Sequence, residues 1–155
     1  MIQRIQSLYL VVAAILVAVA NFFPLAHCFV SDQGFYTINS YGVVASNVAE
    51  FTGSNVWCWL STAFSVVAFC LIVAALFGYK DRIGQMRRCV FAILAIVVYY
   101  VFFGIEVWSL NSATGVFPSL ELIAELPLIA IIIIFLAGRA IKRDEDLVRS
   151  MDRIR

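Results

Sequence analysis

Glu106 is the residue of this sequence best placed to do chemistry inside an apolar segment. It lies near the end of a long hydrophobic run, where an ionisable group is by default a candidate for binding or transferring a proton or a cation. Trp108 follows within one helical turn, and tryptophan is typical of the membrane–water interface. We therefore favour a hydrated carboxylate at the edge of the apolar layer over an intramembrane site.

Glu121 and Glu125 form a second candidate, because carboxylates four residues apart lie on one face of a helix. Such a pair could hold a cation or serve a proton path. The structural alternative is that two acidic side chains near a helix start are tolerated through the helix dipole. Both interpretations stay open at this point.

The four cysteines include no CxxC pair, which argues against a disulfide oxidoreductase. Cys28 and Cys58 are predicted at matching ends of two helices and could form one structural disulfide in an oxidising compartment. His27 is the only histidine, so a haem with two histidine ligands or a zinc site with several is excluded. With no nucleophile–base pair, phosphate loop or metal motif, we expect no catalytic residue, no cofactor, no metal ion and no enzyme.

The elements that carry these residues are predicted to be membrane helices. The chain of 155 residues is 63% hydrophobic and 14% charged, with a mean hydropathy of +0.97. A soluble domain of this size could not hide such an excess of apolar side chains, so they must face lipid. We expect an all-α bundle in a single domain, 1–155, with helices over about 6–28, 56–77, 89–108 and 120–141.

Two smaller elements are predicted outside the helices. Phe35 to Ala45 reads as two short β-prone runs around Asn39 and Ser40, which predicts a hairpin in the first outer loop. The tail, about 142–155, places Leu147, Met151 and Ile154 at positions i, i+4 and i+7. This spacing predicts an amphipathic extension of the fourth helix.

The distribution of charge predicts the orientation in the membrane. All 11 Lys and Arg and five of the ten acids lie in three places, the N-terminus, the 80–88 loop and residues 139–155, which together carry a net charge of +6. The intervening segments carry the other five acids, a net charge of −5. The positive-inside rule then places both termini in the cytoplasm, with Asp32–Asn55 and Ser109–Phe117 outside. A net charge of +1 gives no indication of a nucleic-acid partner.

Several short motifs carry a resemblance to a known family. They are the opening MIQRIQ, the Phe22-Phe23-Pro24-Leu25 segment, Arg87-Arg88 in the loop, and the closing DEDLVRSMDRIR. The chain resembles an uncharacterised family of small bacterial four-helix membrane proteins, known only as a domain of unknown function. The resemblance implies location in the bacterial inner membrane and a multi-pass topology, and it implies no activity.

Two functions of different class remain. The first is a non-enzymatic accessory subunit that sits in the lipid bilayer and docks onto a larger membrane complex. Its docking residues would lie on the basic cytoplasmic face of the tail and are Arg143, Leu147, Arg149, Met151, Arg153 and Ile154. The interleaved acids of the tail favour specific pairing, with a protein or with the inner loop, over a simple lipid anchor. The alternative is a small proton- or cation-coupled transporter or channel that acts as an oligomer, with Glu106 or the Glu121/Glu125 pair as its site.

Overall fold

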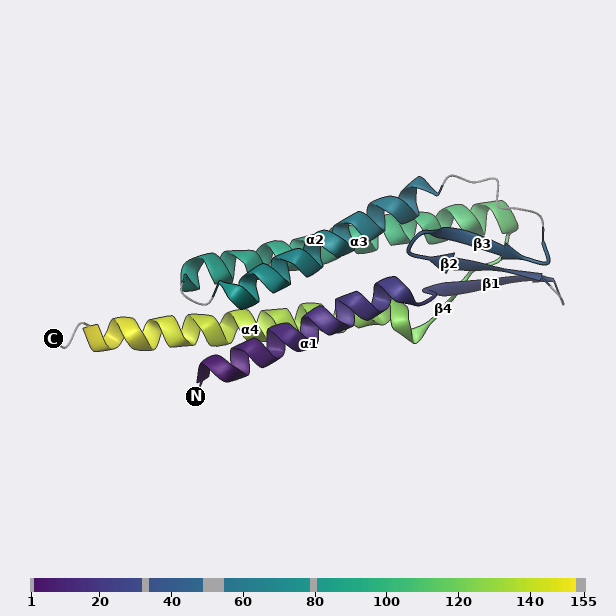
Figure 1. The fold of residues 1–155 in the computed structure, drawn as a ribbon. Helices are drawn as coiled ribbons and strands as arrows, with labels where there is room; N and C mark the ends of the chain where they lie inside the picture. The colour runs from purple at the N-terminus through teal and green to yellow at the C-terminus, as the bar shows by residue number, and fades with distance from the viewer. Residues whose placement is uncertain (1, 32–33, 49–54, 79–80, 153–155) are drawn as a thin grey trace.

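Four long helices run roughly side by side and a small sheet lies at one end of the bundle (Figure 1). The computed structural model describes residues 2–31, 34–48, 55–78 and 81–152, with side chains described in these ranges except at 2–5, 31 and 146–152. The helices are α1 (Ile2–Phe22), α2 (Val56–Phe77), α3 (Arg82–Thr114) and α4 (Leu122–Asp152). The strands are β1 (Ala26–Ser31), β2 (Gly34–Asn39), β3 (Gly42–Ser46) and β4 (Ser119–Leu120).

The bundle consists of two helix pairs, α1 with α4 and α2 with α3 (Figure 1). Small residues line the surfaces where the helices meet. On α4, Ala130, Ile134, Ala137 and Ile141 follow at helical spacing and are fully buried. Alanine lets two backbones approach closely, which is how helices pack when the surrounding solvent is as apolar as the side chains.

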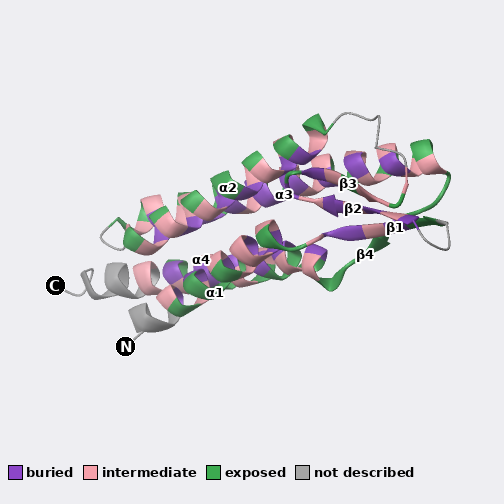
Figure 2. Cartoon of the chain, turned by 45° about the vertical axis from the view of Figure 1, so that its right-hand side comes forward, coloured by how far each residue is buried: buried purple, intermediate pink, exposed green. Residues whose placement is uncertain are grey.

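The outward faces of the helices are apolar as well (Figure 2, green). Large side chains such as Val66, Phe91, Leu94 and Ile132 are about half exposed. A lipid environment explains this arrangement, because apolar faces on every side would be unstable in water. Three helices, α2, α3 and α4, are long and apolar enough to cross a membrane, and α1 has a shorter apolar stretch, Gln6–Phe22.

The four strands form one antiparallel sheet in the order β3-β2-β1-β4. The hairpin predicted around Asn39 and Ser40 is confirmed as β2 and β3. Gly42 follows the turn with φ of 148°, a conformation that a residue with a side chain rarely adopts. The hairpin is anchored to the bundle, since the Thr62 hydroxyl donates to the Ser40 carbonyl oxygen.

The chain is mostly helical as predicted, but the sheet has two strands more than the predicted hairpin, and the first helix is shorter than predicted. The 6–28 range ends as a helix at Phe22, and the residues from Ala26 onward pair with β2 instead. Pro24 accounts for the break, since it lacks the N–H that an α-helix needs and restrains its predecessor. The Leu25 N–H donates to the Ile38 carbonyl oxygen at 2.8 Å, which starts the pairing.

The remaining helices differ from prediction mainly at their ends. The 56–77 prediction for α2 has the bounds that the structure shows. The 89–108 prediction for α3 is too short, because Asp81 caps the helix start through the Gly84 N–H and Gly115 ends it with φ of 72°. Much of the loop expected over Ser109–Phe117 is therefore helical. The 120–141 helix begins at Leu122 and continues to Asp152, which confirms the predicted helical tail.

Candidate functional site

One face of α3 carries a buried polar group into the sheet end of the bundle. Tyr99, Phe103, Glu106 and Leu110 follow at spacings of four, three and four residues, so they lie on one side of the helix. All four are buried, and the Glu106 side chain is only 1% exposed. The Tyr99 and Phe103 rings stack with their centroids 6.1 Å apart. Two aromatic side chains therefore precede Glu106 on the same face of the helix.

Glu106 has no hydrogen-bond partner for either carboxyl oxygen among the described residues, and the same holds for the Tyr99 hydroxyl. The Cys58 thiol, in the first turn of α2, is close enough to interact electrostatically with both groups. A buried carboxylate without a partner is very unfavourable. A proton, a cation or ordered water would have to satisfy it.

The structure thus buries Glu106, which we had placed at the exposed edge of the apolar layer from the sequence. Two features bury Glu106. The helix continues two turns past it, to Thr114. In addition, the sheet packs onto this part of α3, where Leu25 and Ile38 join Phe103 and Leu110 in one apolar cluster.

Cys28 and Cys58 belong to the same apolar cluster, but both thiols are free. The Cys28 sulfur lies 3.5 Å from the Val116 carbonyl oxygen and 3.7 Å from the Thr114 hydroxyl. Cys58 instead faces Glu106. The disulfide considered from the sequence is thus not formed in the structure, and the two thiols serve different contacts.

Glu121 and Glu125 do not form a paired site. α4 begins at Leu122, so Glu121 precedes the helix instead of sharing a face with Glu125. The Glu121 carboxylate lies 3.8 Å from His27 Nε2, and Thr37 Oγ1 lies 3.1 Å from the other ring nitrogen. Both partners of the Glu121–His27 contact are partly exposed, and such surface pairs contribute little to stability.

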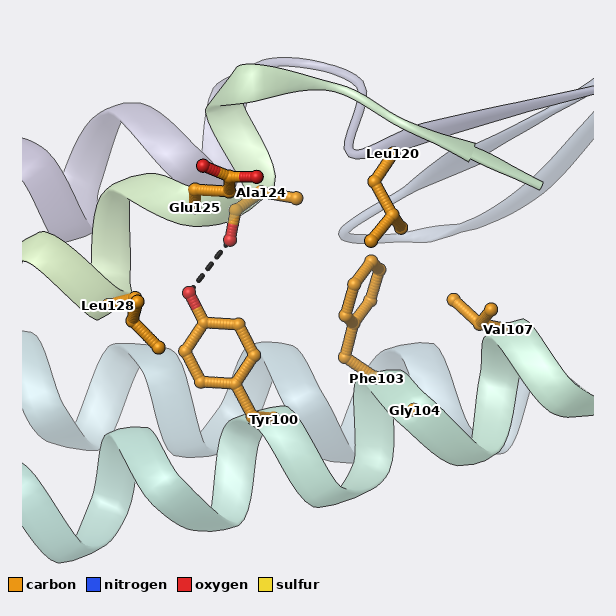
Figure 3. A pocket seen from close by; sticks show the side chains of 8 residues that line it. All are labelled: Tyr100, Phe103, Gly104, Val107, Leu120, Ala124, Glu125 and Leu128. Carbon is orange, nitrogen blue, oxygen red and sulfur yellow. Dashed lines mark hydrogen bonds between the residues drawn. The ribbon is translucent and has the colours of Figure 1, made fainter.

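Glu125 lies at the rim of a groove of about 470 Å³ between α3 and α4. Figure 3 shows its carboxylate directed away from the Tyr100 ring. The Tyr100 hydroxyl donates to the Ala124 carbonyl oxygen at 2.8 Å, in the turn before Pro127. The groove is mostly apolar and presents no second carboxylate, so it does not supply the cation site that the sequence left open.

The opposite end of the bundle, where α1 and α3 begin and α4 leaves, holds a network of paired polar groups. We call it the basic end. Gln6 donates to the Asp144 carboxylate, and Arg82 donates to the Asp144 carbonyl oxygen at 3.2 Å. Arg82 also lies 3.9 Å from Glu145 Oε2. These contacts tie α4 to α1 and α3, so two acids of the tail are engaged within the chain. From the interleaved acids of the tail, the sequence predicted pairing with a protein or with the inner loop, and the Arg82 contacts confirm the second alternative. The contact with Gln6 was not predicted.

Three basic side chains of α4 lie near this network. Arg139, Lys142 and Arg143 are exposed. The remaining predicted docking residues lie beyond them. Leu147, Arg149 and Met151 fall on the helical backbone of α4 with side chains outside the description, and Arg153 and Ile154 lie outside the described residues altogether.

No three His, Cys, Asp or Glu side chains gather as a metal site within the described ranges. Residues 2–154 match the family model for a domain of unknown function, DUF4293. No curated protein and no solved structure matches the chain. Since the family model spans nearly all of its length, the chain belongs to the DUF4293 family.

Proposed function

We propose that this protein is a non-enzymatic accessory subunit of the bacterial inner membrane that docks onto a larger membrane complex through α4. In this proposal all four helices cross the bilayer. The N-terminus, the connection from α2 to α3 and the C-terminus face the cytoplasm. The charge distribution supports this orientation, because all 11 Lys and Arg lie at position 4, at 80–88 or at 139–155, in or next to these segments.

The projection of α4 is the observation that carries the proposal. Its 31 residues make a helix about 46 Å long at 1.5 Å per residue. The hydrocarbon layer needs only about 30 Å. Figure 1 shows the C-terminal part of α4 extending beyond the ends of the other three helices. A helix that continues past its bundle offers a surface to another molecule.

The charges on α4 also favour a docking role. Asp144 and Glu145 are turned toward Gln6 and Arg82, so the acids nearest the bundle are used for internal contacts. Arg143, which precedes them on the helix, is exposed. Further along, the sequence places Leu147, Met151 and Ile154 on one stripe. Burying each apolar side chain against a partner would contribute about 1.5–3 kcal/mol.

Substitution of the stripe tests the proposal. Leu147→Asp and Met151→Asp should release a stoichiometric membrane partner that co-purifies with the tagged protein after gentle extraction. Leu147→Met is the matched control, because it keeps an apolar side chain of similar size and should keep the partner. Membrane insertion should be unchanged in all three. A partner retained equally by Leu147→Asp and by the native chain would refute docking through this stripe.

Arginine geometry provides a second test of the same surface. Arg149→Lys with Arg153→Lys keeps the charge but removes the planar guanidinium groups that bind carboxylates with two hydrogen bonds. The proposal expects a weaker complex in this variant. If the Lys variant holds the partner equally well at raised salt, the tail acts as a membrane-surface helix instead.

A proton- or cation-coupled carrier is the second candidate, and the unpartnered carboxyl of Glu106 favours it. Reconstituted vesicles with an internal pH dye would detect its activity. Glu106→Gln should abolish the flux, whereas Glu121→Gln, at the exposed carboxylate of the same end, should not. A protein that purifies only with copies of itself and shows this flux would replace the docking proposal.

A further inference from the structure

A second groove between α3 and α4 lies toward the basic end of the bundle. It has a volume of about 420 Å³, within the range of about 300–1,000 Å³ that is usual for small-ligand sites. Its walls are apolar and include Val90 and Ile93 of α3 with Phe135 of α4. Val90 and Phe135 are more than half exposed, so the groove opens on the outer, lipid-facing surface of the bundle.

Gly138 helps to keep this groove open. It lies in the wall, and a Cβ built on it would come no nearer than 4.0 Å to its closest neighbour, the Cβ of Cys89. A larger side chain at this position would therefore extend into the groove without a backbone clash. Gly138 is thus the natural position at which to fill the groove.

Two bases, Arg139 and Lys142, complete the lining at the end where the apolar run of α4 stops. Both side chains are exposed. Among the side chains that the structure describes, no acid lies within ion-pair distance of either base. Asp144 and Glu145, the nearest acids in the sequence, are directed to Gln6 and Arg82. Within the described side chains, the groove thus joins an apolar slot to two positive charges without an acidic partner.

We propose that this groove binds an anionic phospholipid of the bilayer, with an acyl chain along Val90, Ile93 and Phe135 and the headgroup phosphate at Arg139 and Lys142. The two halves of the groove match the two halves of such a lipid. Arg139 can bind a phosphate through two parallel hydrogen bonds, and Lys142 adds a point charge. Basic pockets between membrane helices hold anionic headgroups in this way. A neutral lipid could fill the apolar slot but would leave both bases without a counter-charge.

The full-length protein in nanodiscs of equal parts phosphatidylglycerol and phosphatidylcholine tests the proposal. Native mass spectrometry after release should show phosphatidylglycerol retained in preference to phosphatidylcholine. Lys142→Gln should lower this preference about fivefold and Arg139→Gln with Lys142→Gln about 25-fold, at about fivefold per base. Arg87→Gln is the charge-matched control, since Arg87 is exposed but does not line the groove, and it should keep the native preference.

The Gly138→Leu variant distinguishes the contribution of the apolar slot to lipid binding from that of the two bases. It leaves both bases in place and should reduce retention of both lipids. Circular dichroism and the Tm of each variant establish that the fold is intact. Equal retention of the two lipids by the native chain, or a loss in Arg87→Gln as large as in Lys142→Gln, would overturn the proposal. Unchanged retention in Gly138→Leu would show that the lipid does not occupy the groove.

Discussion

The two ends of the helix bundle treat their polar groups in opposite ways. At the basic end, Arg82 reaches both Asp144 and Glu145, and Gln6 completes the set with a hydrogen bond to Asp144. At the sheet end, Glu106 lies buried, and neither of its oxygens has a partner among the described residues.

The difference separates polar groups that hold the fold together from polar groups that do not. The pairs at the basic end are partly exposed. Because they connect α4 to α1 and α3, they fix the point at which α4 leaves the bundle. Glu106 faces the Cys58 thiol of α2, and a hydrocarbon side chain of its size would fit the surrounding apolar cluster better. A buried polar group that stabilises nothing is a candidate for function.

The orientation of the two ends in the membrane gives the largest expected effect, because labelling is all or none. In a background without cysteines, Tyr41→Cys places a thiol at the tip of the hairpin, where the native side chain is 62% exposed. Ser150→Cys places one in the tail. A membrane-impermeant maleimide on intact cells should label position 41 and leave position 150 unmodified.

Permeabilised cells provide the control, since both positions should react once the membrane is open. The reverse pattern on intact cells would place the basic end outside. It would then remove the orientation on which docking in the cytoplasm depends.

Reversing a charge at the sheet end should have the next largest effect. Glu106→Lys puts an ammonium group among Phe103, Leu110 and Cys58, with no acid to pair with it in the described cluster. We expect the free energy of unfolding to fall by more than about 3 kcal/mol. Glu121→Lys makes the same exchange at a side chain that is 47% exposed, and it should change the free energy of unfolding by less than about 1 kcal/mol.

Unfolding in mixed detergent micelles, followed by circular dichroism, measures both variants. Equal stability of the two would mean that Glu106 is hydrated in the membrane after all. The contrast between the two ends would then disappear.

The pairs at the basic end should show a smaller effect. Arg82→Met removes the guanidinium group that contacts Asp144 and Glu145, and about 1 kcal/mol of stability should be lost. Arg87→Met, at an exposed arginine of the same helix, should change stability by less than about 0.5 kcal/mol. If Glu145→Gln adds its full effect on top of Arg82→Met, the two side chains are not coupled.

Local signals in the sequence account for the parts of the fold that were predicted. The bounds of α2 follow from a continuous apolar run, and the hairpin follows from two β-prone runs around Asn39 and Ser40. The helical tail follows from the spacing of Leu147, Met151 and Ile154, and its backbone confirms it as far as Asp152. Each of these signals lies within a few residues of the element that it defines.

Long-range contacts account for the parts that were not predicted. β1 continues the apolar run of α1 directly, and only pairing with β2 and with the distant Leu120 makes it a strand. The burial of Glu106 depends on that same sheet, together with a helix end set by Gly115. A one-dimensional pattern could place Glu106 near the end of an apolar run, but it could not show what would cover it.

Asn21 gives the smallest expected effect and tests a polar contact between two helices near the end of α1 that leads into the sheet. Asn21 Nδ2 donates to the Ser65 hydroxyl of α2 at 2.8 Å. The same amide also donates to the Val17 carbonyl oxygen at 2.8 Å, so one side chain links α1 to α2 and to its own helix. Hydrogen bonds between membrane helices contribute on average about 0.6 kcal/mol, because the unfolded chain in the bilayer also finds partners. Asn21→Leu with Ser65→Ala, measured as a double-mutant cycle, should return a coupling of about this size. A coupling of zero would mean that this hydrogen bond does not help to hold α1 against α2. A coupling well above 1 kcal/mol would make it stronger than the pairs of the basic end.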